Sequence, residues 1–506
     1  MTKHILSKST FMRGCQCTKS LWLYKNHFEL RDEISDDQQS IFSQGADVGK
    51  LAQQLFPGGV DASPETPFEF QQSVADTTKF INDGNEVIYE AAFQFDEVLA
   101  ALDILVKREG GWYGYEVKSS TQINDIYIRD AALQYYVITN SGILLADIFI
   151  VHINNKYVRQ GELDIHELFT IVSVKEAALA LQAKIAMKIP EFKKIISLEK
   201  CPVTDIGGHC STPYGCDFHG YCWQHIPDES VFDLRGIGHF KKSMELYKQG
   251  ILKMADIPHD FPLNKAMRTQ VDLHINKQMS TNKDAIKKFL TTLHYPLYFM
   301  DFETFCIAVP EYNSSWPYQH VPFQFSLHIL EKPGATLQHK EFLADTCKDP
   351  RIDFIAELLA HIGSAGSVVV YNKAFECRIL NEIAISFPHY KKEMENILQR
   401  IVDLMKPFRN RHYYHHLMQG SYSIKKVLPA LIPEMKYDEM DISNGSMASH
   451  AFANLQHETD PEKINQTRRQ LLEYCGLDTL AMVKILEKSS RRLRPVLPDG
   501  VRLSHH

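Results

Sequence analysis

The first half of the chain alternates between two hydrophobic periodicities. Three runs rich in apolar, β-branched and aromatic residues lie between 86 and 118 and predict a meander of strands, with Gly110-Gly111 as a hairpin turn. Residues 40–56, which stop at Pro57-Gly58-Gly59, and the later segment RDAALQYYVIT predict helices. We therefore expect an α/β domain in this part of the chain.

The second half shows the same alternation in a different order. It opens with the apolar strand YPLYFMDFETF, which we expect to end at Asp301-Phe302-Glu303. Strands near 322–329 and 338–344, a helix from Pro350 to about 362, the strand SVVVYN and a helix opening at Asn372 follow, and a long helix comes last. This order predicts a second α/β domain over 291–490. The glycine-punctuated pieces of 228–290 predict a helical connector, and 491–506 form a tail.

Length and composition support this division. A chain of 506 residues is too long for one hydrophobic core. With 44% hydrophobic and 23% charged residues and no apolar run near eighteen residues, we expect a soluble protein that neither spans nor anchors to a membrane. The first ten residues lack the apolar core of a secretory signal, which favours the cytoplasm, a reducing compartment. A net charge of −7 argues against a general polyanion-coating protein.

Cysteines concentrate in residues 201–223, where Cys210, Cys216 and Cys222 recur at intervals of six. Thiolates converging on a metal explain this run better than a core segment does. The Cys-x2-Cys pairs of structural zinc sites are absent, whereas an iron–sulfur cluster accepts irregular spacing and a distant fourth thiolate, here Cys15 or Cys17. The alternatives are free buried cysteines, or zinc with a histidine: His209, His219 or His225.

Carboxylates mark a candidate site in each α/β domain. Glu116 and Lys118 share one face of a predicted strand, and Asp103 lies in the preceding strand. A carboxylate pair can hold a divalent cation while the lysine acts on the attacking water, although an exposed Glu-x-Lys is often only a solvated ion pair. Gln134 lies on the following helix, where a substrate-contacting helix would be.

The second pattern combines a strand with a helix. Asp301 and Glu303 share a strand face directly after buried residues, and burying both charges without a cation would be costly. Tyr474 and Asp478, four residues apart, share one face of the last helix. Taken singly, each pair could also be an ordinary turn pair or helix-surface pair.

The first set of residues resembles a known family. Asp103, Glu116-Val-Lys118 and Gln134, bracketed by an early cysteine and a late cysteine triplet, look like the RecB-like PD-(D/E)XK nucleases of the iron–sulfur type, which include the CRISPR-associated adaptation nuclease and AddB. The resemblance implies a restriction-endonuclease-like fold over 1–227, with Asp103 and Glu116 as metal ligands and Lys118 as the catalytic lysine. It also implies a [4Fe–4S] cluster on four cysteines: Cys17, Cys210, Cys216 and Cys222.

This sequence departs from that family at two places. An early-helix histidine is replaced by Gln53 and Gln54, and the Gln-x3-Tyr motif becomes Gln134 followed by Ile138. The metal site could therefore lack a ligand, for which Glu90 could compensate. Cys15 and Cys201 are alternative cluster ligands.

The second set resembles the DnaQ-like, DEDD-type 3′–5′ exonucleases. Their Asp-x-Glu, Asn-x2-Phe-Asp and Tyr-x3-Asp motifs correspond to residues of 291–490. The resemblance implies an RNase H-like core in which Asp301, Glu303 and Asp478 bind two divalent ions, Mg²⁺ or Mn²⁺, and Tyr474 orients the attacking water. Glu376 stands where the family has aspartate, so either the longer carboxylate is tolerated, or Asp403 replaces it, or activity is lost.

Both halves together resemble an uncharacterised bacterial family in which a RecB-like nuclease precedes a DnaQ-like domain. We expect a metal-dependent nuclease that acts on DNA at two sites, with end processing, repair and defence as the candidate processes. The alternatives are a nucleic-acid-binding adaptor with degenerate sites, and an RNA-processing exonuclease. A basic aromatic segment is also predicted to contact a nucleic-acid strand, through Arg409, Arg411, Tyr413, Tyr414, Lys425 and Lys426.

Overall fold

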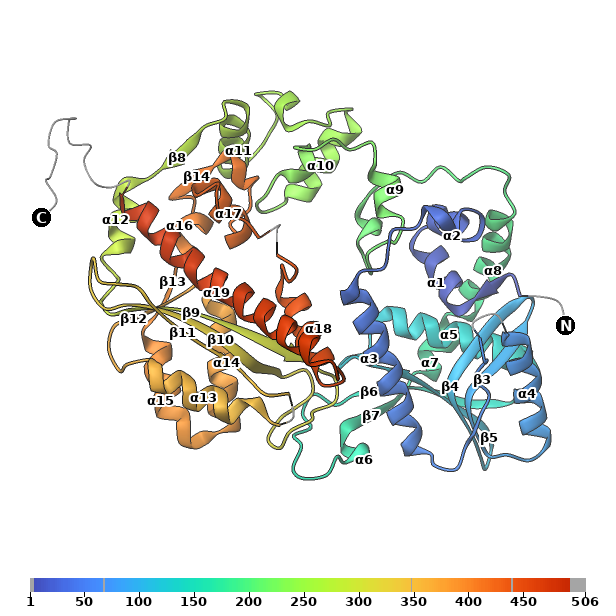
Figure 1. The fold of residues 1–506 in the computed structure, drawn as a ribbon. Helices are drawn as coiled ribbons and strands as arrows, with labels where there is room; N and C mark the ends of the chain where they lie inside the picture. The colour runs from blue at the N-terminus through green and yellow to red at the C-terminus, as the bar shows by residue number, and fades with distance from the viewer. Residues whose placement is uncertain (1–3, 67–68, 347, 438–439, 492–506) are drawn as a thin grey trace, which may run out of the picture. The chain divides into compact units, whose positions relative to one another are not determined.

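The computed structural model describes residues 4–66, 69–346, 348–437 and 440–491, so most of the predicted tail lies outside it. It is a mixed α/β structure that divides into two compact units (Figure 1). Unit 1 comprises residues 1–225 and 307–319, and unit 2 comprises residues 226–306 and 320–506. Among the described residues, no helix combines the length and apolar character needed to cross a membrane.

Unit 1 is built on a seven-stranded sheet of order β2-β3-β4-β5-β6-β7, with β1 paired to β4. The predicted meander is confirmed, because β3, β4 and β5 pair antiparallel in sequence. The strands are β1 (Leu6–Ser7), β2 (Val60–Asp61), β3 (Val87–Phe95), β4 (Val98–Arg108), β5 (Gly111–Lys118), β6 (Leu145–Ile153) and β7 (Phe169–Ser173). The helices are α1 (Lys8–Gln16), α2 (Thr18–Asn26), α3 (Asp36–Ala52), α4 (Phe70–Asn82), α5 (Asp125–Asn140), α6 (Ile165–Leu168), α7 (Lys175–Ala180), α8 (Gln182–Ile196) and α9 (His219–Trp223).

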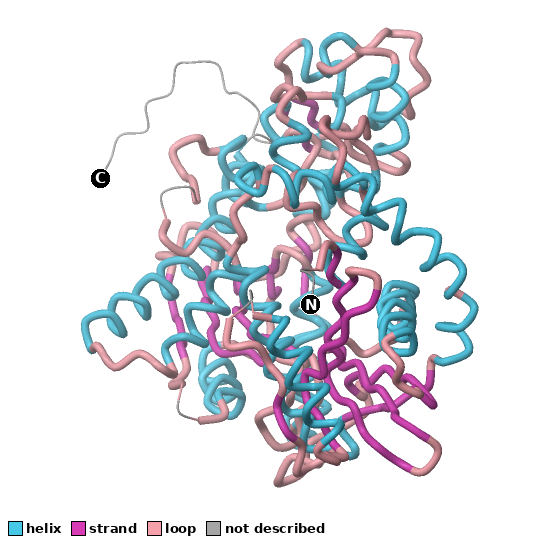
Figure 2. The backbone as a smooth tube through the Cα atoms, turned by 90° about the vertical axis from the view of Figure 1, so that its right-hand side faces the viewer, coloured by secondary structure: helices cyan, strands magenta, loops and turns pink. Residues whose placement is uncertain are grey.

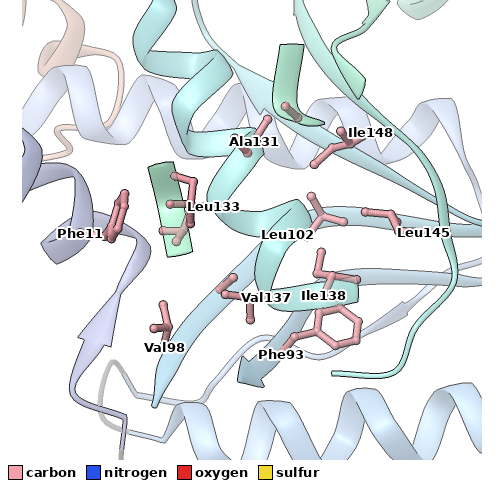
Figure 3. Close-up of a cluster of buried hydrophobic side chains, with 14 of the residues drawn as sticks. Phe11, Phe93, Val98, Leu102, Ala131, Leu133, Val137, Ile138, Leu145 and Ile148 are labelled. Carbon is pink, nitrogen blue, oxygen red and sulfur yellow. The ribbon is translucent and has the colours of Figure 1, made fainter. Parts of the chain in front are cut away.

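The main core of unit 1 lies between this sheet and helices α1, α5 and α8 (Figure 3). Phe11 of α1 meets Phe192 of α8 edge to face, with ring centroids 5.2 Å apart. Leu133 and Val137 of α5 are fully buried against strand residues such as Leu102. Burial of this apolar stripe fixes α5 over β4 and β6, which brings the polar residues of α5 to the edge of the same sheet.

Unit 2 contains a five-stranded sheet of order β11-β10-β9-β12-β13 and a separate two-stranded ribbon, β14-β8. The strands are β8 (Met279–Thr281), β9 (Leu297–Cys306), β10 (His320–Leu330), β11 (Gln338–Leu343), β12 (Ser367–Val370), β13 (Ile401–Asp403) and β14 (Tyr413–His415). The first three strands of the large sheet are antiparallel, while β12 runs parallel to both β9 and β13. The order of elements predicted for 291–490 is thus confirmed.

Helices cover both faces of that sheet, with α19 along one face and α13 on the other (Figures 1 and 2). The helices are α10 (His239–Lys248), α11 (Lys265–Ile275), α12 (Lys283–Leu290), α13 (Pro350–His361), α14 (Lys373–Ser386), α15 (Lys391–Gln399), α16 (Lys406–Arg409), α17 (Ile424–Leu431), α18 (Gly445–Leu455) and α19 (Pro461–Arg491). Met300 and Phe302 of β9 join the core under α13. By strand alternation Asp301 and Glu303 face the side covered by α18 and α19.

Two details of unit 2 differ from expectation. Strand β9 does not end at Glu303 but continues to Cys306, because its antiparallel ladder with β10 extends to the pair Cys306 and His320. The segment 228–290, expected to be a connector of short helical pieces, also supplies strand β8, whose ladder partner β14 lies far along the sequence. Sequence periodicity cannot reveal so short a strand.

Candidate functional sites

The first site lies where two strands of unit 1 separate. Strands β4 and β5 pair from their hairpin as far as Ile104 and Tyr115. Past this last pair, the Val117 N–H donates to the Asp103 carboxylate at 2.5 Å. The inward and outward alternation of β4 shifts by one residue here, since Leu102 and Leu105 join one core while Ile104 joins the other. The splayed strands bring Asp103 and Glu116 to one location.

Lys118 joins Glu116 to helix α5. Its Nζ donates to Glu116 Oε1 and to Asp130 Oδ2, both at 2.6 Å, which confirms that Glu116 and Lys118 share a face. Gln134 donates to Glu116 Oε2 at 2.7 Å from one helical turn beyond Asp130. The structure therefore brings all four predicted residues of this half together: Asp103, Glu116, Lys118 and Gln134.

Two residues of this site were not predicted. Lys8, the first residue of α1, donates to Glu116 Oε1 at 2.7 Å and lies 3.9 Å from Asp130 Oδ2. Asp130 is buried, and its Oδ1 has no hydrogen-bond partner. The only sequence signal for Asp130 was its i, i+4 relation to Gln134, and Lys8 gave none because its partner is 108 residues away.

The charges at this site oppose one another. Burial raises the pKa of Asp103 to about 8, helped by the neighbouring Glu116. Burial also raises the pKa of Glu90 to about 7. Burial alone would raise the pKa of Glu116, but Lys118 and Lys8 outweigh it and hold that pKa below its usual range. One ionised carboxylate held by two lysines therefore lies beside two carboxyls whose raised pKa values disfavour their ionisation near neutrality.

Glu90 lies opposite Asp103, because its neighbours Tyr89 and Ala91 pair with Ile104 and Leu102. Its backbone is left-handed, with φ of 52°, an uncommon conformation inside a strand. Such strain at a non-glycine residue often accompanies a functional position. At the two positions where this chain departs from the PD-(D/E)XK family, Gln54 is exposed and Ile138 is fully buried in the core.

The second site is a small cavity in unit 1 lined by four cysteines: Cys17, Cys210, Cys216 and Cys222. Cys17 lies between helices α1 and α2, where its Sγ caps α2 by accepting from the Ser20 N–H at 3.5 Å. The loop that carries Cys210 and Cys216 is held to α1 by Gln16, whose side chain donates at 2.8 Å to the carbonyls of His209 and Tyr214. The predicted set of four is thus brought together around one cavity.

The spacing of these sulfurs separates two kinds of metal site. Tetrahedral zinc, with Zn–S bonds of about 2.3 Å, requires thiolates about 3.8 Å apart. Among the described residues, the side chains that bring three potential ligand atoms within 4.8 Å of one another are Asp301, Glu303 and Cys475. None of the cavity cysteines belongs to this set, so no three of their sulfurs are that close together. These sulfurs are therefore not arranged as the thiolates of a tetrahedral zinc ion would be.

The two alternative cysteines occupy other surroundings. Cys15 packs against the main core of unit 1, and its thiol interacts with Arg129. Cys201 packs beside Trp22 and Phe218 but does not line the cavity. The geometry favours Cys17 over both.

The third site is a group of carboxylates in unit 2. Asp301 and Glu303 of β9 lie with Cys475 of α19 so that one ligand atom of each is within 4.8 Å of the other two. Asp478, one turn along α19, accepts a hydrogen bond from the Tyr437 hydroxyl at 2.7 Å and another from Tyr474. The sequence-predicted residues Asp301, Glu303, Tyr474 and Asp478 therefore converge.

Glu376 completes this group from helix α14. Only 2% of its surface is exposed, and its Oε2 has no hydrogen-bond partner. Its charge acts on Asp301, whereas Asp403 acts on Glu376, accepts from the Met405 N–H at 3.0 Å and lies 3.6 Å from Arg409. Of Glu376 and Asp403, Glu376 is therefore the one whose charge affects Asp301.

Every carboxyl of this group has a raised pKa. Burial, together with the neighbouring Asp478, holds the pKa of Asp301 and that of Glu303 well above the usual range. Burial raises the pKa of Glu376 to about 8, and raises that of Asp478 to about 6 despite the hydrogen bond from Tyr437. Lys425 is a nearby cation, and its Nζ lies 5.7 Å from the ring centroid of Tyr437 and 5.6 Å from that of Tyr474.

Comparison with known proteins bears on the same region. Residues 298–423 match the family model described as Domain of unknown function (DUF2779). The matched segment contains Asp301, Glu303 and Glu376, and it ends before Tyr474 and Asp478.

The chain is also similar to part of a longer protein. The "Uncharacterized protein UU173" of Ureaplasma parvum serovar 3 (strain ATCC 700970) is 26% identical over 250 residues. The alignment covers 44% of this chain and 35% of that protein, so the chain matches about a third of its relative's length. Neither description states an activity.

Two residues around the third site gave no signal in the sequence. Tyr437 lies in a loop without periodicity, and the periodicity of the last helix does not single out Cys475. Lys425 was predicted to contact a strand, but it also faces the carboxylate group. The predicted strand contacts by Tyr413 and Tyr414 are wrong as stacking contacts, because the β8–β14 ribbon packs both rings to 3% exposure or less.

Proposed function

We propose that this protein is a metal-dependent nuclease that hydrolyses phosphodiester bonds of DNA at two sites. Unit 2 would be an RNase H-like, DEDD-type 3′–5′ exonuclease, and unit 1 a restriction-endonuclease-like PD-(D/E)XK nuclease. The observation that carries the proposal is the convergence in unit 2 of Asp301, Glu303, Glu376 and Asp478. Carboxylates buried together repel one another, so divalent cations are the natural complement of such a site.

The residues present fit hard divalent cations such as Mg²⁺ or Mn²⁺. The donors are carboxylate oxygens, and the unpartnered Oε2 of Glu376 leaves one of them free for a ligand. Cys475 is a poor ligand here, because burial and the surrounding carboxylates hold its pKa well above the usual range and keep the thiol protonated. When bound, the cations would activate water and stabilise the leaving oxygen of the phosphate.

Protein groups would supply orientation around them. Tyr474 and Tyr437 both donate to Asp478, which fixes the direction of that carboxylate. Tyr474 also lies where it could orient the attacking water, and Lys425 beside both rings is a cation for the charge that develops on the phosphate.

Unit 1 supports the second activity through the same logic. Asp103 and Glu116 would hold a cation, with Glu90 as the further carboxylate that the departure from the family pattern requires. Lys118 would orient the attacking water, because its Nζ is held by Glu116 and Asp130 at the edge of this group. Burial alone would lower the pKa of Lys118, but these carboxylates raise it and keep the lysine a charged donor. DNA is proposed as the substrate on the strength of the resemblance to nucleases that process DNA.

We further propose a [4Fe–4S] cluster on Cys17, Cys210, Cys216 and Cys222. The support is the donor set of four thiols around one cavity and a spacing too wide for tetrahedral zinc. The cluster would tie α1 to a loop about two hundred residues later and stabilise unit 1, since closing that loop otherwise has an entropic cost.

The test is a cleavage assay on anaerobically purified protein. End-labelled single- and double-stranded DNA and RNA are incubated with Mn²⁺, with Mg²⁺ or with EDTA. With Lys118→Ala in place, stepwise shortening from the 3′ end should persist in Mn²⁺ and stop when Asp301→Asn is added. Absence of shortening on every substrate would leave unit 2 as a binding module, and shortening of RNA alone would favour RNA processing.

A further inference from the structure

Unit 2 contains an open hollow of about 450 Å³ apart from the carboxylate group. Its lining comes from the loop before α10, from the start of α11 and from residues 408–422. Its charged side chains are Arg235, Lys265, Arg409 and Arg411. A hollow of this size is within the range of ligand pockets, and every charged group that lines it is basic.

The hollow is held in shape by tight packing. Gly420 has a left-handed backbone, and a Cβ there would lie 2.5 Å from Gln270 Nε2 and 2.7 Å from Arg235 Cγ. The Gly420 N–H donates to the Tyr414 hydroxyl at 2.9 Å, and Gln270 Oε1 accepts from the Arg235 N–H at 3.1 Å. Only glycine lets this loop approach so closely, so the two walls are fixed against each other.

Three of the four cations that line this pocket form no salt bridge with a described carboxylate. Arg411 is partly buried, donates to the Ala266 carbonyl and lies over the Tyr414 ring with its guanidinium carbon 5.3 Å from the centroid. Among the described residues, no carboxylate forms a salt bridge with Arg235, Lys265 or Arg411, whereas Arg409 lies 3.6 Å from Asp403. Burial lowers the pKa of Arg411, as expected for a cation without a counter-charge. An anion would supply the missing charge.

The pocket is linked to the carboxylate group within the same unit. The Tyr371 hydroxyl donates to the Tyr422 carbonyl at 2.8 Å, and Tyr371 directly follows β12 and precedes the helix that carries Glu376. The Tyr422 side chain itself is 43% exposed at the pocket, so its ring is available to a flat ligand.

We propose that this pocket binds a backbone phosphate of single-stranded nucleic acid, with one base stacked on Tyr422. The inference rests on the proposed function, because it places a strand on the unit that carries the carboxylate group. Arginines and a lysine bind phosphates, and an exposed tyrosine stacks on a base only where that base is unpaired. The pocket would hold the strand while its end reaches the carboxylates.

The test is fluorescence anisotropy of a labelled single-stranded oligonucleotide on the full chain in EDTA, which prevents cleavage. Lys265→Gln should weaken binding several-fold and make the dependence of log K on log salt shallower by about 0.7, the value for one lost phosphate contact on a single strand. Tyr422→Ala should weaken binding about tenfold with an unchanged salt slope, because stacking releases no counterions. Lys332→Gln, an exposed lysine in the β10–β11 turn, is the matched control and should change neither quantity.

Three outcomes would overturn the proposal. One is equal binding by Lys265→Gln and Lys332→Gln, and another is unchanged binding by Tyr422→Ala. The third is complete displacement of the strand by inorganic phosphate at matched ionic strength, which would indicate a site for the free ion. Arg411→Gln, with Arg411→Lys as the rescue, gives a second phosphate contact to test.

Failure of the proposed function is measured separately. A nitrophenyl ester of thymidine monophosphate carries a single nucleotide, so in a Lys118→Ala background its Mn²⁺-dependent hydrolysis reports the carboxylate group of unit 2. Lys265→Gln and Tyr422→Ala should hydrolyse it at the parent rate. If the protein without a pocket substitution does not hydrolyse the ester, the nuclease proposal for unit 2 is refuted. The anisotropy series would still show whether the pocket binds a nucleic-acid strand.

Discussion

The buried carboxyl of Glu376 gives the sharpest prediction, because replacing it should stabilise the metal-free protein. Burial raises its pKa from 4.5 to about 8, which at about 1.4 kcal/mol per pKa unit corresponds to about 5 kcal/mol against the charged form. Because the pKa of Glu376 is higher in the folded than in the unfolded protein, its protonated carboxyl contributes to the stability of the fold. This contribution is complete below about pH 4.5 and is lost as the pH rises through 8.

Glu376→Gln keeps the shape of the protonated carboxyl and cannot ionise. In EDTA above about pH 8 it should therefore raise the free energy of unfolding of unit 2 by about 3 to 5 kcal/mol, and near pH 5 it should change it little. Mn²⁺ should narrow this difference at high pH, because a cation at about a hundred times its Kd stabilises the parent by about 2.7 kcal/mol and the variant lacks one of its ligands.

The readout must be specific to unit 2, since all four tryptophans lie in unit 1. Hydrogen exchange followed by mass spectrometry on peptides of β9 and β12 meets this need. Glu331→Gln, an exposed glutamate of the same unit, is the control and should stay within about 0.5 kcal/mol. If Glu376→Gln exchanges as fast as the parent, or faster, in EDTA above pH 8, the carboxylate is not an unsatisfied charge and the cation argument fails.

Three further predictions concern the other residues. Lys118→Ala should abolish cleavage by unit 1, while Mn²⁺ binding measured by calorimetry should persist. Because Lys8 holds Glu116, Lys8→Met should lower the kcat of unit 1 by about tenfold to a hundredfold, and Lys8→Arg should recover part of it. Equal rates for Lys8→Met and the parent would refute that role of Lys8. Cys216→Ser should lose iron, sulfide and visible absorption and lower the melting temperature of unit 1; zinc without iron in the parent would contradict the cluster. Tyr437→Phe and Tyr474→Phe should each slow 3′ shortening less than Asp301→Asn does, and a variant as inactive as Asp301→Asn would show that the phenol does more than orient.

Much of each site was predictable because it depends on local periodicity. Strand alternation puts Asp301 with Glu303, and Glu116 with Lys118, whatever the rest of the chain does. The helical repeat likewise puts Tyr474 and Asp478 on one face of α19. The convergence of these pairs followed from element order, which the sequence also indicated.

What the sequence left open depended on contacts between distant segments. Only the packed structure brings Lys8 to Glu116, selects Cys17 over Cys15, and puts Glu376 rather than Asp403 beside Asp301. Each of these outcomes follows from where burial of apolar faces positions a whole helix or loop, and no spacing along the chain encodes that position. The sequence by itself determined which side chains share a face, and tertiary packing decided which faces meet.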